Sequence, residues 1–426
     1  MGTLLAFSIL GLEVSKAMNV VYERCCGLDV HKGTVVACRI TPGAEGQPLK
    51  EVRTFETMTD DLLALSRWLA EAGVTHVAME STGPYWKPIW NILEGDFDLT
   101  LANPRDIKAL SGRKTDRCDA QWIADLFRHG LIRPSFVPDR GQRELRELTR
   151  YRVSLVQERS AEINRLQKTL EGANVKLASV VSDVHGVSAR GMLAGLVSGR
   201  SDTAALAELA RGTMRSKIPL LQRALQGSFA PHQRFLIAQQ LAHIDALDAS
   251  IAAIEAEIEE RTRPFADEVQ RLDTIPGIGP TSARGLIAEF GVDMAKFIDA
   301  NHFASWGRMC PGMNESAGKR HSSKTGKGNR WLKRLLVEAA HAAGRSKTYL
   351  GSQYHRLAVR HGKKKAAVAV GHSILVIAYH ILSKPGTIFE DLGPDYFDRR
   401  DKSRLTRDLV KRLQGLGYYV TLEHAA

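Results

Sequence analysis

Apolar positions in the N-terminal part of the chain alternate between two spacings, one typical of strands and one typical of helices. Short β-rich runs predict strands at four places: residues 25–40 (a strand or a hairpin), 51–55, 75–80 and 98–103. Apolar residues at three- and four-residue steps predict helices at three places: 60–72, 86–93 (interrupted by a proline) and about 116–129. Strands that alternate with helices are typical of a layered α/β domain, predicted here over residues 25–138.

The pattern then changes to long helices rich in charged residues. In residues 141–178 and 235–264, apolar residues recur every three or four positions between charged ones. This spacing predicts two long helices that pair as a helix hairpin or a coiled coil. We assign residues 139–268 to this helical middle region.

A turn containing two glycines opens the C-terminal part. The segment TIPGIGPTSA (274–283) resembles a helix-hairpin-helix, in which backbone N–H groups of the turn and of the next helix hold a DNA phosphate. The region 269–385 is predicted to be helical throughout, and the polar tail 386–426 carries an amphipathic helix near 405–413. With an N-terminal extension over 1–24, the predicted fold class is α/β plus all-α.

Positive charge is concentrated in the C-terminal half. The whole chain has 59 Lys and Arg against 47 Asp and Glu, a net charge of +12. Residues 301–365 alone contain 15 Lys and Arg and 2 acids, which gives +13. A basic run is often only a solvated surface, but so many uncompensated charges in one segment repel one another. We therefore predict that this part binds the phosphates of nucleic acid.

Cysteine and hydropathy patterns exclude two other classes. The five cysteines contain no CxxC pair, so neither a disulfide framework nor a zinc knuckle is indicated, and a reducing cytoplasm fits. The apolar run 3–12 is too short to span a bilayer and has no basic residue before it, so we expect neither a signal peptide nor a membrane partner. Because Met18 precedes the first predicted strand, residues 1–17 are either an upstream extension or part of the functional chain.

Four carboxylates have the chemistry and the positions of a metal site. Asp29 lies in an apolar strand, Glu80 ends the next core strand, and Asp116 and Asp119 share one face of a predicted helix. Taken singly, each is more often a cap or a solvent-facing residue. Together, in this order on an α/β background, they match the ribonuclease-H-like nucleases. Four carboxylates match Mg²⁺ or Mn²⁺, and two such ions stabilise both oxygens of a phosphodiester exchange.

Serines surrounded by cations form the second candidate site. An exposed serine among cations can attack a phosphodiester and form a covalent phosphoserine. Chemistry alone leaves Ser316, Ser322 and Ser323 open. The predicted nucleic-acid contacts are two residues near the acids, Arg113 and Lys114, and five near the serines: Lys319, Arg320, Lys324, Lys327 and Arg330.

Three segments carry a resemblance to a known family. GLDVHKGTVVA, AMESTGPYWKPIW and LANPRDIKALSGRKTDRCDAQWIADLFRHGLIRPSFVP resemble the N-terminal domain of the DEDD-type insertion-sequence transposases, which is similar to the junction resolvase RuvC. The matching acids are Asp29, Glu80, Asp116 and Asp119. The segment SAGK (316–319) is similar to the serine motif of the family's C-terminal domain and favours Ser316 as nucleophile. Glu315 departs from that motif, and this leaves Ser322 open.

The resemblance implies a mechanism and a set of partners. It implies strand cleavage and transfer through a transient serine–DNA link, on donor and target DNA, with a structured guide (bridge) RNA bound to the protein. It also implies a homo-oligomer, a dimer that forms a tetramer on DNA, with the middle helices mediating dimerisation. We expect a cytoplasmic, nucleoid-associated protein. The alternatives are a hydrolytic Holliday-junction-type nuclease and an inactive nucleic-acid-binding relic.

Overall fold

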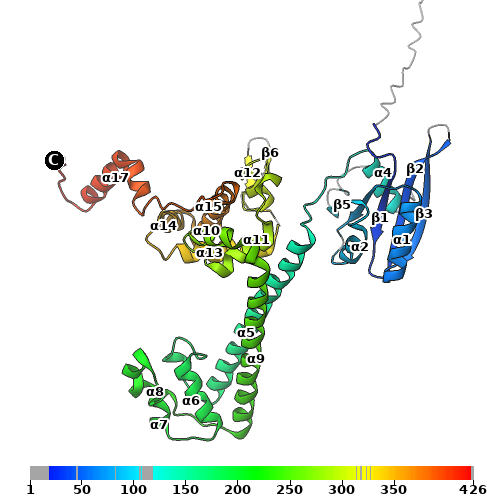
Figure 1. Ribbon diagram of the computed structural model, residues 1–426. Coiled ribbons are helices and arrows are strands. Elements are labelled where there is room, and N and C mark those ends of the chain that lie inside the picture. The colour runs from blue at the N-terminus through cyan, green and yellow to red at the C-terminus, as the bar shows by residue number, and fades with distance from the viewer. Residues whose placement is uncertain are drawn as a thin grey trace, which may run out of the picture. The chain divides into compact units, whose positions relative to one another are not determined.

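The computed structural model divides the chain into two compact units, Met1–Val137 and Pro138–Ala426 (Figure 1). It describes residues 19–44, 47–81, 83–104, 107, 119–312, 314–316, 319–322, 324–326 and 328–423, with the backbone alone at 314–316 and 320–322. Each unit is described below by itself.

The first unit is built on a five-stranded sheet in the order β3-β2-β1-β4-β5. The strands are β1 (Cys25–Val30), β2 (Thr34–Pro42), β3 (Pro48–Glu56), β4 (His76–Glu80) and β5 (Asp98–Ala102). The first three form an antiparallel meander, and β4 and β5 extend it in parallel. All four strand predictions are confirmed, with 25–40 as a hairpin. The sheet is compatible with a ribonuclease-H-like domain.

Helices cover both faces of this sheet. The helices are α1 (Thr59–Glu71), α2 (Trp86–Leu93) and α4 (Asp119–Arg128). Because neighbouring residues of a strand point to opposite faces, Leu28 and Val30 pack with α1 and α2, whereas Cys25 packs with α4. The proline predicted to interrupt α2, Pro88, does not do so. It lies in the first turn, where a backbone N–H has no helical partner to lose.

Two long antiparallel helices dominate the second unit. They are α5 (Arg140–Gly172) and α9 (Pro231–Thr262). Leu145 of α5 packs with Ile258 of α9, and further along Leu155 packs with Leu247. Arg152 pairs with Glu255 and Arg159 with Asp248 across the same seam. The predicted helix hairpin is confirmed. Its use as a coiled-coil dimer interface stays a prediction.

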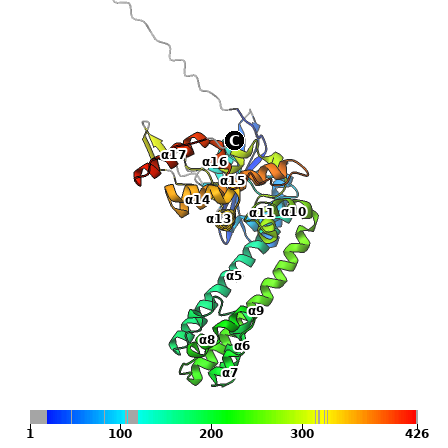
Figure 2. The ribbon, with the colours of Figure 1, turned by 90° about the vertical axis from the view of Figure 1, so that its left-hand side faces the viewer.

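The far end of this hairpin carries a small helical subdomain that the apolar pattern did not indicate (Figure 2). Its elements are η2 (Leu177–Ser179), α6 (Val187–Val197), α7 (Thr203–Ala207), η3 (Gly212–Lys217) and α8 (Ile218–Ala224). Their apolar side chains form one core with the adjoining ends of α5 and α9, including Leu166, Leu170, Ile237 and Ile244. The elements are too short to have a recognisable period, and this core comes from tertiary packing.

The opposite end of the hairpin joins a C-terminal globule. It contains η4 (Arg263–Phe265), α10 (Ala266–Asp273), α11 (Pro280–Phe290), η5 (Met294–Lys296), α12 (Ala300–Trp306), β6 (Asn314–Ser316), β7 (Lys319–Ser322), α13 (Arg330–Ala343), α14 (Tyr349–His361) and α15 (Lys363–Ser383), followed by α16 (Tyr396–Arg400) and α17 (Lys402–Gly415). The amphipathic helix predicted near 405–413 is confirmed. The expectation of an all-helical region is wrong at 314–322, where β6 and β7 form an antiparallel hairpin.

Among the described helices, α15 has the length and apolar composition to cross a membrane. Its buried residues, including Val370, Ile374 and Ile381, instead lie in the core of the C-terminal globule. A central core helix is apolar on most sides for the same reason as a membrane helix, because neighbours surround it. The apolar character of α15 is therefore explained by packing.

A buried carboxylate joins three helices of the second unit. Glu289 of α11 has a side chain only 2 % exposed and makes two hydrogen bonds with Arg150 of α5, of 2.9 and 2.7 Å. The side-chain amide of Asn329, the cap of α13, also donates to Glu289. Arg146 lies 3.7 Å from the same carboxylate, and burial lowers the pKa of its guanidinium to about 10. One buried acid thus compensates two partly exposed cations.

We predict that Glu289→Gln destabilises the protein by about 3 kcal/mol, because it removes the buried counter-ion of two largely buried guanidinium groups, Arg146 and Arg150. Urea unfolding followed by circular dichroism measures this loss. The matched control is Glu255→Gln, which breaks the ion pair of Glu255 with Arg152. Because the Glu255 side chain is 43 % exposed, this variant should lose less than about 1 kcal/mol of stability. Equal losses in the two variants would contradict the role given to Glu289.

Candidate active site

Asp29 and Glu80 lie beside each other at the ends of two parallel strands. The register of β1 and β4 pairs Leu28 with Met79, and the next residue on each strand is one of these two acids. Leu28 packs on the α1 side of the sheet, so Asp29 points to the α4 side. Ala78 packs on the α4 side, and Glu80, two residues later, faces the same way. Both acids are half-buried.

Asp119 is brought to the same face because α4 lies very close to β1. A Cβ atom on Gly27 would be 2.3 Å from the backbone nitrogen of Ala124 and 2.6 Å from the carbonyl oxygen of Ala120. The C-terminal end of α4 lies at the start of β1, where Val21 N–H donates to the Arg128 carbonyl at 2.8 Å. The helix therefore runs antiparallel to β1, and Asp119 begins it at the end of the strand that bears Asp29.

Three of the four predicted carboxylates thus share one face and one end of the sheet. The fourth, Asp116, lies outside the described residues, as do Arg113 and Lys114. Within the described part of the chain, no group of three His, Cys, Asp or Glu side chains is already close enough to hold a metal ion. The carboxylates of Asp29 and Glu80 are still the hard oxygen donors that a divalent cation prefers.

His31 is a neighbour to which the sequence analysis assigned no role. Its Nε2 lies 3.1 Å from Oδ2 of Asp29, whose side chain is 19 % exposed. The signal in the sequence is the spacing Asp-Val-His, because alternate residues of an extended chain point the same way. The imidazole is therefore a hydrogen-bond partner that orients the Asp29 carboxylate.

The candidate serine lies at the tip of the hairpin formed by β6 and β7. Ser316 is the last residue of β6 and pairs with Lys319, the first residue of β7. Ser322 is the last residue of β7, opposite Asn314, at the other end of this short ladder. The two serines that chemistry alone could not separate therefore occupy different ends of the hairpin, with Ser316 beside the turn. Ser323 lies outside the described residues.

The predicted cations surround this hairpin to different extents. Lys319 and Lys324 are exposed, and the exposed guanidinium of Arg330 lies 4.8 Å from the ring centre of Trp331. The side chain of Arg320 and the whole of Lys327 are outside the described part of the structure. The described cations are accessible to a polyanion.

Arg308 is a cation near the hairpin that sequence reasoning missed. It has a positive φ of 52°, which is uncommon for a residue with a side chain. A Cβ atom at Gly328 would lie 2.5 Å from its Cβ and Cγ, and one at Gly326 would lie 3.2 Å from its Cδ. Glycines in the loop after β7 thus leave room for this side chain. In the sequence, the only sign of this contact is the pair of glycines Gly326 and Gly328. The structure explains why both are glycines, because a side chain there would crowd Arg308.

The glycine turn predicted at 274–283 joins α10 to α11 and packs inward. Gly277 has a φ of +92°, and a Cβ there would lie 2.2 Å from the carbonyl oxygen of Ala339 in α13. Ile275 and Ile278 beside it are buried. Two helices joined by a turn are present here, and Gly277 serves helix packing; the helix-hairpin-helix assignment stays a prediction. Phosphate binding by the turn stays a prediction.

Comparison with known proteins places these two sites in one family. Residues 26–175, which include all four acids, match the model of the DEDD transposases of the IS110 type, described as "Transposase". Residues 269–356, which include the serine hairpin, match the model described as "Transposase IS116/IS110/IS902 family". The two matches together cover more than half of the chain. The chain belongs to the IS110 family of DEDD transposases.

A curated relative agrees with this assignment. The chain is 24% identical over 297 residues to the transposase for insertion sequence element IS1111A of Coxiella burnetii (strain RSA 493 / Nine Mile phase I), covering 67% of this chain and 72% of that protein. The protein is therefore a DNA transposase, an enzyme of transposition. Membership of the family implies in general a DNA substrate, oligomerisation and a divalent metal ion.

We predict that Gly27→Ala lowers strand cleavage by the transposase and destabilises it by about 1–3 kcal/mol, because the new Cβ forces α4 away from β1. Cleavage of its own element's end and urea unfolding measure the two effects. Gly33→Ala is the matched control, because a Cβ at this position has nothing within 4 Å. If both variants behave alike, the close approach of α4 does not position Asp119.

Proposed function

We propose that the protein cuts and rejoins DNA strands with two groups, the carboxylates Asp29, Glu80, Asp116 and Asp119 and the hydroxyl of Ser316. The observation that carries the proposal is the strand register that brings Asp29 beside Glu80, on the face where α4 begins with Asp119. A half-buried acid in an otherwise apolar strand loses part of its hydration, and catalysis is a reason to keep it there.

The carboxylates fit a divalent cation. Their oxygens are the ligands of Mg²⁺ and Mn²⁺, and Asp29 is oriented by His31 while part of its side chain is exposed. A cation held by these acids supplies positive charge to the phosphate oxygens during the exchange. In this chain, Asp29, Glu80, Asp116 and Asp119 are the residues that would hold it.

The serine performs the covalent step. The Ser316 hydroxyl loses its proton to a base, its oxygen forms a bond to the phosphorus, and the bond from phosphorus to the leaving deoxyribose oxygen breaks. The leaving oxygen takes up a proton and becomes a free DNA hydroxyl. Attack of another DNA hydroxyl on the phosphoserine restores Ser316 and joins the new strands. The described cations on this part of the chain that can bind the phosphate include Lys319, Lys324, Arg330 and Arg308.

The finer partners belong to the same proposal. We include donor and target DNA, a structured guide RNA, and a dimer that forms a tetramer on DNA, so that a carboxylate unit of one protomer meets the serine hairpin of another. What supports RNA binding is the excess of positive charge in the C-terminal half, since structured RNA is bound largely through its backbone and shape. A DNA-bound enzyme of this kind is nucleoid-associated in the cytoplasm.

The test is the detection of a covalent protein–DNA adduct on the ends of its own insertion element. We expect an adduct in the unaltered protein with Mg²⁺, none in Ser316→Ala, and a normal yield in Ser322→Ala, the matched control on the same hairpin. Asp29→Asn should lower strand cleavage by at least about a hundredfold while DNA binding is kept. If the adduct forms in Ser316→Ala but not in Ser322→Ala, the nucleophile is Ser322. If the unaltered protein cleaves DNA without forming any adduct, the protein is a hydrolytic junction nuclease.

A further inference from the structure

A groove lies between α14 and the C-terminal helices α16 and α17. It encloses about 810 Å³, and its walls carry five cations: Arg356, Arg360, Arg404, Lys411 and Arg412. The groove is formed by specific contacts. The backbone N–H of Tyr349 donates to Asp391 at 2.9 Å, and the ring of Tyr349 stacks on Phe397 at 5.2 Å. The tail is therefore held against α14.

The acids in this groove already have partners. Asp398 pairs with Arg356 at 3.1 Å and Asp408 with Arg404 at 4.0 Å. Asp401 caps α17 by accepting a hydrogen bond from the Arg404 backbone N–H at 3.2 Å. Since all three acids that line the groove are engaged, the surplus charge there comes from the remaining cations.

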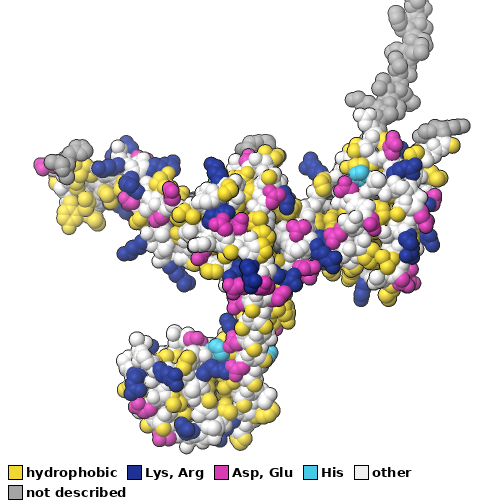
Figure 3. Space-filling view, in the orientation of Figure 1, with side chains coloured by type: hydrophobic (Ala, Val, Ile, Leu, Met, Phe, Trp, Pro, Cys, Tyr) yellow, Lys and Arg dark blue, Asp and Glu magenta, His cyan; other side chains and the backbone are white. Residues whose placement is uncertain are grey.

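Arg360, Lys411 and Arg412 have no acidic partner among the described residues, and they stand on both walls of the groove. The first turn of α15 begins with three consecutive exposed lysines, Lys363–Lys365. In the space-filling view, Lys and Arg side chains lie interspersed with Asp and Glu over the part that holds α14 and α17 (Figure 3). Like charges on neighbouring residues repel one another, so an excess of cations over the three acids of the groove favours a polyanionic occupant.

We propose that this groove binds the phosphate backbone of DNA. The charge of the groove is complementary to DNA, the substrate that the family implies. The proposal rests on the DNA part of the proposed function but not on which serine or acids perform the chemistry. Helix α17 has no buried residue, so its cations can follow a backbone without disturbing a core. The residues of the groove are separate in sequence from the serine hairpin, so the groove gives the protein a second binding site for DNA.

An acidic protein helix is the competing occupant. The groove also exposes Val359, which is 89 % accessible, and Leu409, and an amphipathic helix could cover both. We favour DNA because exposed cations continue in sequence beyond Arg360 to Lys363–Lys365 at the start of α15. Cations carried by several helices match the repeating negative charge of a nucleic-acid backbone.

The experiment compares the full chain with the variant Arg360→Gln, Lys411→Gln, Arg412→Gln. Binding to a short duplex of its own element is measured by fluorescence anisotropy over a range of salt concentrations. We expect the Kd to rise by at least about tenfold and the slope of log K against log salt to fall by about 3, since each lost phosphate contact removes about 0.9. The adduct on Ser316 should still form at saturating protein concentration.

The matched control is the variant Arg200→Gln, Arg211→Gln, Arg223→Gln. It removes three cations from the small helical subdomain at the far end of the α5–α9 hairpin. It has the same change of net charge, and its salt slope should stay unchanged. Because α17 could unfold in the first variant, Lys363→Gln, Lys364→Gln, Lys365→Gln tests the groove's edge from α15. The proposal is overturned if the groove variants keep the slope of the unaltered protein, if the control loses as much, or if only binding of structured RNA falls.

Discussion

The ion cluster around Glu289 is the interaction on which the second unit depends. Taking guanidinium groups largely out of water costs free energy, and the buried carboxylate of Glu289 offsets part of this cost for Arg150, which donates two hydrogen bonds to it, and for Arg146, which lies 3.7 Å away. Glu289 sits in α11, its arginines Arg146 and Arg150 in α5, and its amide partner Asn329 at the start of α13. Since α5 begins just after the carboxylate unit and α13 follows the serine hairpin, this one acid ties together the helices next to both candidate sites.

Close approach of backbones positions the helices of the site. In the first unit, Gly27 lets α4 lie against β1 at Ala120 and Ala124, and this brings Asp119 to the face of Asp29 and Glu80. In the second, Gly277 lets the turn before α11 lie against Ala339 of α13. In both places a side chain on the glycine would collide with backbone, which cannot move as a flexible side chain can. The position of α4, and with it the position of Asp119, therefore depends on the absence of a Cβ atom at Gly27.

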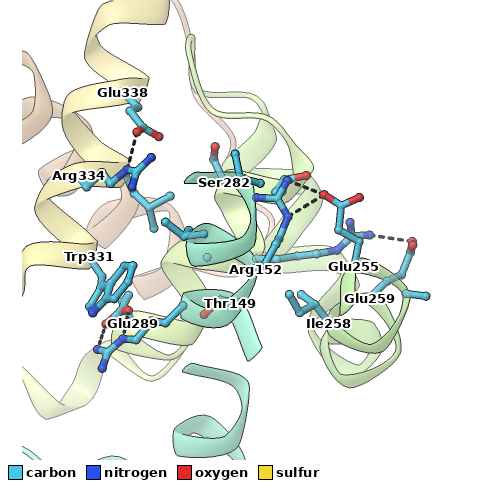
Figure 4. A pocket seen from close by; sticks show the side chains of 18 of the residues that line it. Thr149, Arg152, Glu255, Ile258, Glu259, Ser282, Glu289, Trp331, Arg334 and Glu338 are labelled. Atoms are coloured by element: carbon cyan, nitrogen blue, oxygen red, sulfur yellow. Dashed lines mark hydrogen bonds and ion pairs between the residues drawn. The ribbon is translucent and has the colours of Figure 1, made fainter. Parts of the chain in front are cut away.

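Charges in this protein divide into paired and unpaired groups. A cavity of about 400 Å³ between α5, α9, α11 and α13 is lined by arginines, but they are neutralised by pairs such as Arg152 with Glu255, Arg284 with Glu259 and Arg334 with Glu338 (Figure 4). The groove beside α17 instead has more Lys and Arg than Asp and Glu side chains. A count of Lys and Arg along the chain does not separate these cases, because the pairing partners come from distant segments.

The sequence by itself determined the local elements and the chemistry of the site. Alternating apolar positions predicted β1 to β5, three- and four-residue steps predicted α5, α9 and α17, and the motif around Ser316 and the four acids indicated a transposase. These features are local, since strand and helix periods and motif spacing lie within a few residues.

Only the tertiary structure decided the rest. The face shared by Asp29, Glu80 and Asp119, the small subdomain at the far end of the α5–α9 hairpin and the ion pairs of Glu289 all require segments far apart in the chain to meet. The β6–β7 hairpin was missed because strands of three and four residues are too short to show a period. Contacts between distant segments are set by packing and burial, which no local pattern contains.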